Sequence, residues 1–229
     1  MSRIEIIPAI LVNGFAELSA DVELMKGFVK TVQIDACDGR FVPNATWPYR
    51  KHDENFERIV GEQDGMPGWK ELNFEIDLMA DDPQDKVEPW VQAGASRVIL
   101  HAEAKGDIAG AIASLAGRIE VGIAFDMSTD LRASLSALRA SGAEISSIQL
   151  MGIDNVGFQH QPFDEKVVGR VREARLEFPE LPIAVDGGVS LETAPALIAA
   201  GADRLVVGSA IFAAENPIDA IAAFKRLTK

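Results

Sequence analysis

The segment TVQIDACDGRFVPN, residues 31–44, places an amide and a carboxylate where a buried strand normally carries apolar side chains. Side chains alternate along a strand, so Gln33 and Asp35 share one face while Val32 and Ile34 occupy the other. Polar groups of this kind are costly to bury unless they are hydrogen-bonded or used. The pair therefore marks this face as a candidate site for acid–base or metal chemistry.

Two further aspartates occur at the ends of other strand-like segments. The same alternation directs these side chains inward: Asn73, Glu75, Asp77, Met79, Gln149, Met151, Ala184 and Asp186. Two carboxylates about 4 Å apart repel by roughly 4 kcal/mol at an effective dielectric constant of about 20. Relief comes from a bound cation or from protons held on some of the acids. A loop-capping role explains any one aspartate equally well, but three together favour a site.

Eight short apolar runs provide the frame that must position these side chains. Strands are predicted over residues 4–11, 31–36, 72–79, 97–103, 120–126, 146–152, 181–187 and 204–210. A longer stretch with helical spacing follows each run, and Gly94, Gly142 and Gly201 lie where helices are expected to end. Ser190 and Asp82 are predicted to be helix N-caps.

This alternation predicts an α/β fold, a (β/α)8 TIM barrel formed by residues 1–229 as a single domain. The alternative is an open, doubly wound sheet, but the Gly-x-Gly-x-x-Gly turn of such sheets is missing after the first strand. Barrel chemistry lies at the carboxyl ends of the strands, which is where Asp35, Asp77 and Asp186 occur.

Glycine-rich turns near the end of the chain predict an anion site. VDGGVS contains Gly187 and Gly188 after the seventh strand, and VVGSAIF contains Gly208 and Ser209 at the end of the eighth. The loops after these two strands commonly form a phosphate site in barrels, because glycine lets backbone N–H groups approach a ligand. Two such turns at this pair of strands are a stronger signal than either alone.

Composition limits the partners. The formal net charge of −13 argues against nucleic acid or an anionic membrane as a partner, although backbone N–H groups can still hold a phosphate locally. No apolar run approaches the length of a membrane span, and the first residues lack a signal-peptide layout. Cys37 is the single cysteine, which excludes an internal disulfide and a thiolate metal cage. We expect a cytoplasmic protein.

The motifs together resemble the ribulose-phosphate 3-epimerase family from end to end. QIDACDGRFVPN is similar to its His-x-Asp-x-Met-Asp-Gly-His-Phe-Val-Pro-Asn, and IDLMADDP to its His-Leu-Met segment. HAEA, IAVDGGV and AGADRLVVGSAIF match almost as they stand. The resemblance implies a ribulose-phosphate-binding barrel that epimerises a ketose phosphate, such as ribulose 5-phosphate/xylulose 5-phosphate or a related sugar phosphate, by proton transfer at C3 through an enediolate. It also implies a homo-oligomer.

In that family two histidines and two aspartates hold a divalent metal, and the aspartates act as acid and base on opposite faces of C3. The resemblance assigns these catalytic roles to Asp35 and Asp186. Gln33 and Asp77 replace the two histidines, so the implied metal set is Gln33, Asp35, Asp77 and Asp186. This set offers only oxygen, so we expect Mg²⁺ or Mn²⁺ rather than Zn²⁺. The alternative is a metal-free site whose acids share protons.

The middle of the substrate pocket departs from the family pattern. Cys37 replaces an active-site methionine, and the Asn-Pro-Gly-Phe-Gly-Gly-Gln loop reads DNVGFQHQ at residues 154–161. The resemblance implies substrate- and phosphate-binding roles for Ala9, Gly157, Phe158, Gln159, His160, Gly187, Gly188, Gly208 and Ser209. His101 is interpreted as structural and His160 as a substrate contact.

Two other functions stay open at this point. A non-catalytic phosphosugar-binding barrel would keep the phosphate site, but it would not need acids on both faces of a substrate. An isomerase or aldolase of altered substrate would use the same enediolate chemistry. Phosphosugar decarboxylases and hexulose-phosphate synthases on similar barrels rely on a lysine among the strand-end acids. Residues 31–36 and 72–79 contain no lysine, which disfavours that chemistry.

Overall fold

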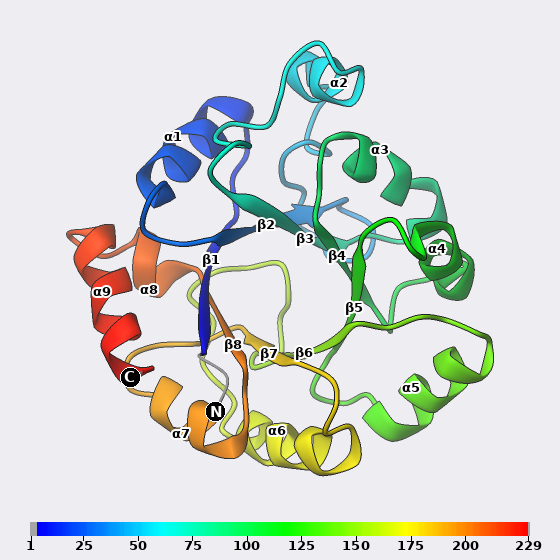
Figure 1. The fold of residues 1–229 in the computed structure, drawn as a ribbon, viewed down its shortest axis with the longest axis vertical. Coiled ribbons are helices and arrows are strands. Elements are labelled where there is room, and N and C mark those ends of the chain that lie inside the picture. The colour runs from blue at the N-terminus through cyan, green and yellow to red at the C-terminus, as the bar shows by residue number, and fades with distance from the viewer. Residues whose placement is uncertain (1–3, 229) are drawn as a thin grey trace.

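The computed structural model describes residues 4–228, whose strands form a closed parallel barrel in the order β1 to β8 (Figure 1). The strands are β1 (Glu5–Ile10), β2 (Thr31–Cys37), β3 (Asn73–Met79), β4 (Arg97–His101), β5 (Glu120–Phe125), β6 (Ser147–Met151), β7 (Ile183–Asp186) and β8 (Arg204–Val207). Each lies within or overlaps one of the eight predicted segments. The predicted TIM-barrel fold is therefore confirmed.

Helices form the outer ring of the barrel (Figure 1). They are α1 (Phe15–Met25), α2 (Glu54–Val60), α3 (Val87–Gln92), α4 (Ile108–Leu115), α5 (Leu131–Ala140), α6 (Lys166–Glu177), α7 (Ala194–Ala200), α8 (Ser209–Phe212) and α9 (Pro217–Leu227), with a 3₁₀ turn η1 (Pro83–Asp85) before α3. Asp53, Asp107, Asp130 and Asn216 cap α2, α4, α5 and α9 by accepting backbone N–H groups. None of the helices in residues 4–228 has the length and apolar character to cross a membrane.

Neither cap predicted from sequence forms in full. Thr193, rather than Ser190, occupies the N-cap position of α7, although Ser190 Oγ accepts the backbone N–H groups of Glu192 and Thr193 in the turn before this helix. Asp82 does occupy the N-cap position of η1, but its side chain makes no capping bond. Its backbone is left-handed, with φ of 53°, whereas a capping residue is usually extended. The carboxylate instead pairs with Arg40 at 3.0 Å.

The interior of the barrel contains small apolar clusters as well as polar side chains. Ile7, Ala9, Ala184 and Val206, from β1, β7 and β8, form a separate buried apolar cluster. Outward-facing residues of the strands pack against the helices in the main core, as alternation predicts. Ile99, Ala124 and Met151, from β4, β5 and β6, form a second buried apolar cluster, so polar side chains share the interior with both clusters.

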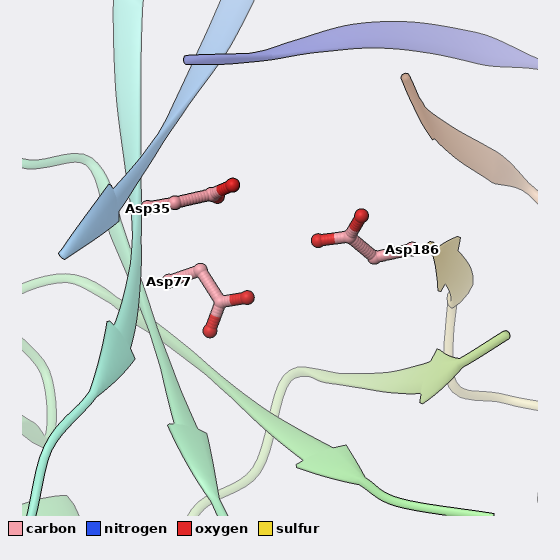
Figure 2. Close-up of side chains that lie close together, drawn as sticks. All are labelled: Asp35, Asp77 and Asp186. Atoms are coloured by element: carbon pink, nitrogen blue, oxygen red, sulfur yellow. The ribbon is translucent and has the colours of Figure 1, made fainter. Parts of the chain in front are cut away.

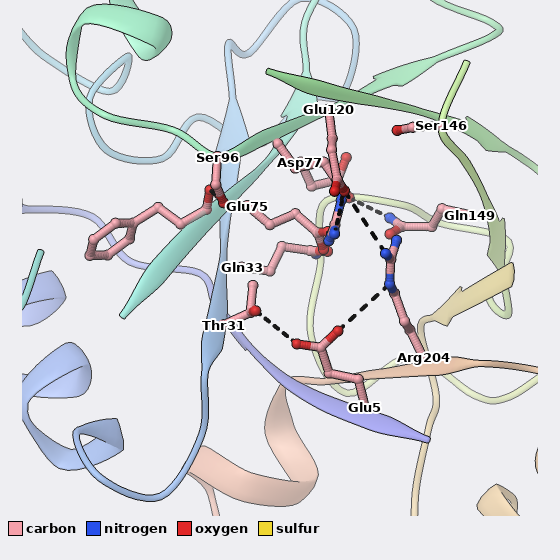
Figure 3. Close-up of polar contacts among 12 residues, drawn as sticks. Glu5, Thr31, Gln33, Glu75, Asp77, Ser96, Glu120, Ser146, Gln149 and Arg204 are labelled. Carbon is pink, nitrogen blue, oxygen red and sulfur yellow. Dashed lines mark hydrogen bonds and ion pairs between the residues drawn. The ribbon is translucent and has the colours of Figure 1, made fainter. Parts of the chain in front are cut away.

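Ion pairs cross the interior near the amino ends of the strands (Figure 3). Arg97 pairs with the buried Glu75 and, through Nη2, with Glu120 Oε2 at 2.6 Å. Burial raises the pKa of Glu75 although the Arg97 guanidinium opposes it. This layer lies one step along β3 from the candidate acids, because Glu75 precedes Asp77 on the same face.

The same layer joins the first strand to the last. Arg204 on β8 approaches Glu5 on β1 at 3.7 Å and Glu120 on β5 at 3.9 Å. Glu5 also accepts a hydrogen bond of 2.8 Å from the hydroxyl of Thr31 on β2 (Figure 3). We call the pairing of β1 with β8, together with the Glu5–Arg204 contact, the seam of the barrel.

Candidate active site

Three aspartates meet at the carboxyl ends of the strands (Figure 2). Asp35 and Asp77 are register partners on β2 and β3, and Asp186 at the end of β7 points toward them from the other side of the interior. One carboxylate oxygen from each lies within 4.8 Å of the others. Asp77 is fully buried, while Asp35 and Asp186 are each 8% exposed. The convergence expected from strand alternation is present.

The amide of Gln33 bridges two of these acids. Its Nε2 donates hydrogen bonds of 2.8 Å to Asp35 Oδ1 and to Asp186 Oδ2. The side chain is fully buried, and its Oε1 finds no hydrogen-bond partner among the described residues. Gln33 and Asp35 thus share a face because the amide supplies donors to a carboxylate pair that would otherwise repel.

Asp77 is held by two different side chains. His101 Nε2 donates to its Oδ1 at 2.9 Å, and Gln149 Nε2 donates to its Oδ2 at 3.1 Å. The His101 ring is buried and packs against Phe41, with ring centroids 5.0 Å apart. Alternation placed Gln149 inward but gave it no role, and His101 was interpreted as structural. Their contacts with Asp77 could not be anticipated from strand spacing alone.

Burial and crowding shift the titration of these groups. Desolvation, and then the charges of Asp186 and Asp77, hold the pKa of Asp35 well above its usual range. Desolvation and the Asp77 charge raise the pKa of Asp186 to about 7, although Gln33 and a backbone N–H oppose the shift. Burial would lower the pKa of His101, but the Asp77 carboxylate outweighs it and the pKa is raised. Acids that titrate near neutral pH suit general acid–base catalysis.

One pocket brings the acids and the glycine-rich turns together. Asp35 and Asp186 both line this pocket. All the residues to which the family resemblance assigned substrate or phosphate contacts line it too: Ala9, Gly157, Phe158, Gln159, His160, Gly187, Gly188, Gly208 and Ser209. Gly188 has φ of 68°, and a Cβ there would lie 2.8 Å from Phe163 Cα. Only glycine therefore fits this position, as expected where backbone must approach a ligand.

Comparison with known proteins gives the family. The description "Ribulose-phosphate 3 epimerase family" matches residues 5–212. The chain belongs to the ribulose-phosphate 3-epimerase family. It is 30% identical to the ribulose-phosphate 3-epimerase of Mycobacterium bovis, over 96% of this chain and 91% of that protein. It is 29% identical to the Bacillus subtilis ribulose-phosphate 3-epimerase, over 91% and 92%.

Solved structures show the same fold at lower identity. A 3-hexulose-6-phosphate synthase superposes with a TM-score of 0.71 at 20% identity, over 99% of this chain and 100% of that one. The 3-keto-L-gulonate-6-phosphate decarboxylase of Vibrio cholerae gives 0.71 at 12% identity, over 99% and 98%. At these identities the likeness speaks for the barrel alone.

This family member differs from the epimerase pattern in the donors around its acids. The described site offers three carboxylates and the amide of Gln33, so its oxygens could hold a divalent cation. Such a set fits a hard cation, because zinc prefers nitrogen and sulfur. The ring nitrogen of His101 that faces the site already contacts Asp77. Imidazole coordination of the kind implied by the family motif therefore has no counterpart at Gln33 and Asp77.

The loop over the pocket differs from the rest of the epimerase family motif as well. His160 has φ of 60°, a conformation that favours glycine, and it stands where the motif has glycine. Asn44 Nδ2 donates to the carbonyl oxygen of Gly157 at 2.9 Å, which ties this loop to the segment after β2. The glycine turns after β7 and β8 are thus kept, while the loop of residues 154–161 carries longer side chains than the family motif.

Proposed function

We propose that the protein epimerises a ketose phosphate at C3 through an enediolate, with ribulose 5-phosphate/xylulose 5-phosphate or a related sugar phosphate as substrate. One observation carries the proposal. Asp35 and Asp186 reach one pocket from opposite sides of the barrel, and the same pocket contains the glycine-rich turns after β7 and β8. Inversion at a carbon needs an acid and a base on opposite faces, and a phosphate needs a cradle of backbone N–H groups.

In this proposal the phosphate binds near Gly188, Gly208 and Ser209, which places the sugar carbons toward the acids. One aspartate removes the C3 proton from one face, and the other returns a proton to the opposite face. Gln33 donates to both carboxylates, so it stays hydrogen-bonded to whichever acid is ionised. The pKa of Asp186, raised to about 7, lets this group accept or donate a proton near neutral pH, and the raised pKa of Asp35 favours its protonated form.

We also propose that the site can take Mg²⁺ or Mn²⁺. Asp35, Asp77 and Asp186 would hold the cation. Gln33 Oε1, which is buried without a partner within residues 4–228, would join them if the amide turned over and gave up its hydrogen bonds to Asp35 and Asp186. A bound cation would stabilise negative charge on the enediolate oxygens. The competing state keeps the acids protonated and metal-free. Metal analysis of purified protein, followed by chelation and calorimetric titration with Mg²⁺, Mn²⁺ and Zn²⁺, separates the two.

The proposed reaction is tested by loss of the C3 proton to deuterated solvent across a panel of ketose phosphates. We expect exchange and epimer formation with the wild type and loss of both in D35N and D186N. Asp126→Asn is the matched control, because Asp126 also follows a strand but does not line the pocket. Absence of exchange on every substrate would contradict the proposal. It would favour a non-catalytic binder if the phosphates still bound, and an isomerase or aldolase if other products formed.

The protein's location and assembly remain part of the proposal. Relatives of this chain include a rice enzyme described as a cytoplasmic isoform and an Arabidopsis enzyme described as chloroplastic. We propose a cytoplasmic homo-oligomer, in keeping with the composition and with the family resemblance. Fractionation and light scattering of the purified protein test the two parts separately.

A further inference from the structure

Gln149 is a fully buried side chain on β6 that no part of the proposed reaction uses. Its Nε2 lies 3.1 Å from Asp77 Oδ2 (Figure 3). The same nitrogen lies 3.5 Å from Asp186 Oδ2, so Gln149 bridges acids from two other strands. It makes no hydrogen bond with Asp35 among the described residues. Its contacts are therefore confined to one of the two acids that exchange protons.

The amide oxygen of Gln149 is the unfavourable part of this arrangement. Gln149 Oε1 is buried and has no partner in the described part of the chain. A buried acceptor without a donor is unfavourable, and an apolar side chain of similar shape would remove it. Such a side chain would in turn leave Asp77 Oδ2 without the donor described here, because His101 reaches Oδ1, whereas Asp186 would keep Gln33. The amide at residue 149 therefore satisfies one buried oxygen and leaves another unsatisfied, so its net gain in stability is small.

The amide has a clear effect on Asp186. Gln33 Nε2 and Gln149 Nε2 approach Oδ2 of this carboxylate at 2.8 Å and 3.5 Å, and both contacts restrict its rotation. Apart from the backbone N–H of Gly187, which also acts on the carboxylate, no donor in the described part of the chain competes for Oδ1, the oxygen that would exchange a proton with a substrate in the pocket. A carboxylate that can rotate freely would spend less time with this oxygen correctly placed.

We propose that Gln149 is a positioning residue for Asp186, an inference that rests on the proposed epimerase function. It orients the acid on the β7 side of the substrate without touching the acid on the β2 side. Its removal should slow proton exchange on one face of C3 only. Phosphate binding should be unaffected, since Gln149 does not line the pocket.

The test compares the wild type with Gln149→Met, which keeps the volume and removes the donor. We expect kcat to fall by about 10- to 100-fold, the usual effect of losing a group that orients a site residue, with KM changed by less than about twofold. We also expect little change in the melting temperature, because removal of the unsatisfied Oε1 offsets the donor lost by Asp77 Oδ2. Leu150→Met is the matched control, because it changes the same strand on the face that packs against the helices.

A second measurement distinguishes positioning from general damage. In deuterated water, the ratio of label in product to label in recovered substrate reports how the enediolate divides between the two acids. A partly unfolded variant loses all rates in proportion, so this ratio stays constant. We expect the ratio to change at least about threefold in Gln149→Met. Gln149→Glu, which places a carboxylate against Asp77 and Asp186, should lose more activity than Gln149→Met.

The outcomes separate the two proposals. An active wild type with unchanged kcat and label ratio in Gln149→Met would overturn the positioning role alone. A proportional loss with a lower melting temperature would also overturn it, because it would show a structural role. A wild type that exchanges no proton on any ketose phosphate would overturn the proposed function and this inference with it.

Discussion

Replacing Asp186 by Asn should make the protein more stable above neutral pH while removing its activity. The pKa of Asp186 is raised from 3.8 to about 7, first by desolvation and then by the Asp77 charge. A carboxyl group with a raised pKa in the folded state binds its proton more tightly there than in the unfolded chain. Its contribution to stability is therefore complete below about pH 4 and is lost as the pH rises through about 7.

The size of the effect follows from the pKa difference. About three pH units at roughly 1.4 kcal/mol each give a loss of about 4 kcal/mol in the free energy of unfolding. This is an upper limit, because Asp35 can keep a proton that Asp186 releases and so share the cost. The amide introduced by Asp186→Asn would carry no charge at any pH, and it is close in size to a carboxyl group. The variant should therefore lack this part of the pH dependence.

Urea unfolding of both proteins with a chelator present, at several values between about pH 5 and about pH 8, measures the difference. We expect the wild type to lose stability over this range relative to Asp186→Asn, and the two curves to converge toward acid. The raised pKa of His101 acts in the same direction in both proteins, so it cancels in the comparison. Asp154→Asn, which changes an exposed acid, serves as the control. Parallel curves for the wild type and Asp186→Asn would refute the argument that Asp186 is buried at a cost.

Three further predictions concern the acids, the cation and the phosphate. Asp35→Asn should reduce kcat by at least about 100-fold while the protein still binds inorganic phosphate, and retained turnover would remove Asp35 from the acid–base pair. Mg²⁺ or Mn²⁺ should raise the melting temperature of chelated wild type but not of Asp77→Asn, whereas stoichiometric, tightly held Zn²⁺ would contradict an oxygen-only site. Gly188→Ala should weaken phosphate binding, because a Cβ would lie 2.8 Å from Phe163 Cα; equal affinity in calorimetry would place the anion elsewhere.

The positions of the acids could be predicted because they follow from local sequence patterns. Alternation along a strand gives the face of Asp35, Asp77 and Asp186, and a parallel barrel brings strand ends to one mouth. The eight segments themselves follow from short apolar runs separated by helical stretches. The glycine turns after β7 and β8 could also be recognised in the sequence. Gly188 has a positive φ and a close contact with Phe163 that only glycine allows.

The contacts between side chains could not be predicted in the same way. The bonds of Gln149 to Asp77 and Asp186 depend on how far strands tilt and stagger around the barrel, which alternation does not give. The failure at Asp82 has a similar origin. Its residue type favours a cap, but a left-handed backbone and an ion pair with Arg40 direct its carboxylate elsewhere. Both cases depend on neighbours that are distant in sequence.

The seam has a consequence for folding of the chain during its synthesis. β1 can pair on both edges only after β8 has been synthesised, and at about 5–20 residues per second roughly 10–40 s separate Ile10 from Arg204. During that time one edge of β1 is open to pairing with another nascent chain. Pro8 has no N–H to offer, and Glu5 carries a charge that finds Arg204 only at closure. A proline and a charge at a strand edge both disfavour pairing with another chain, so Pro8 and Glu5 would lower the risk of aggregation during this interval.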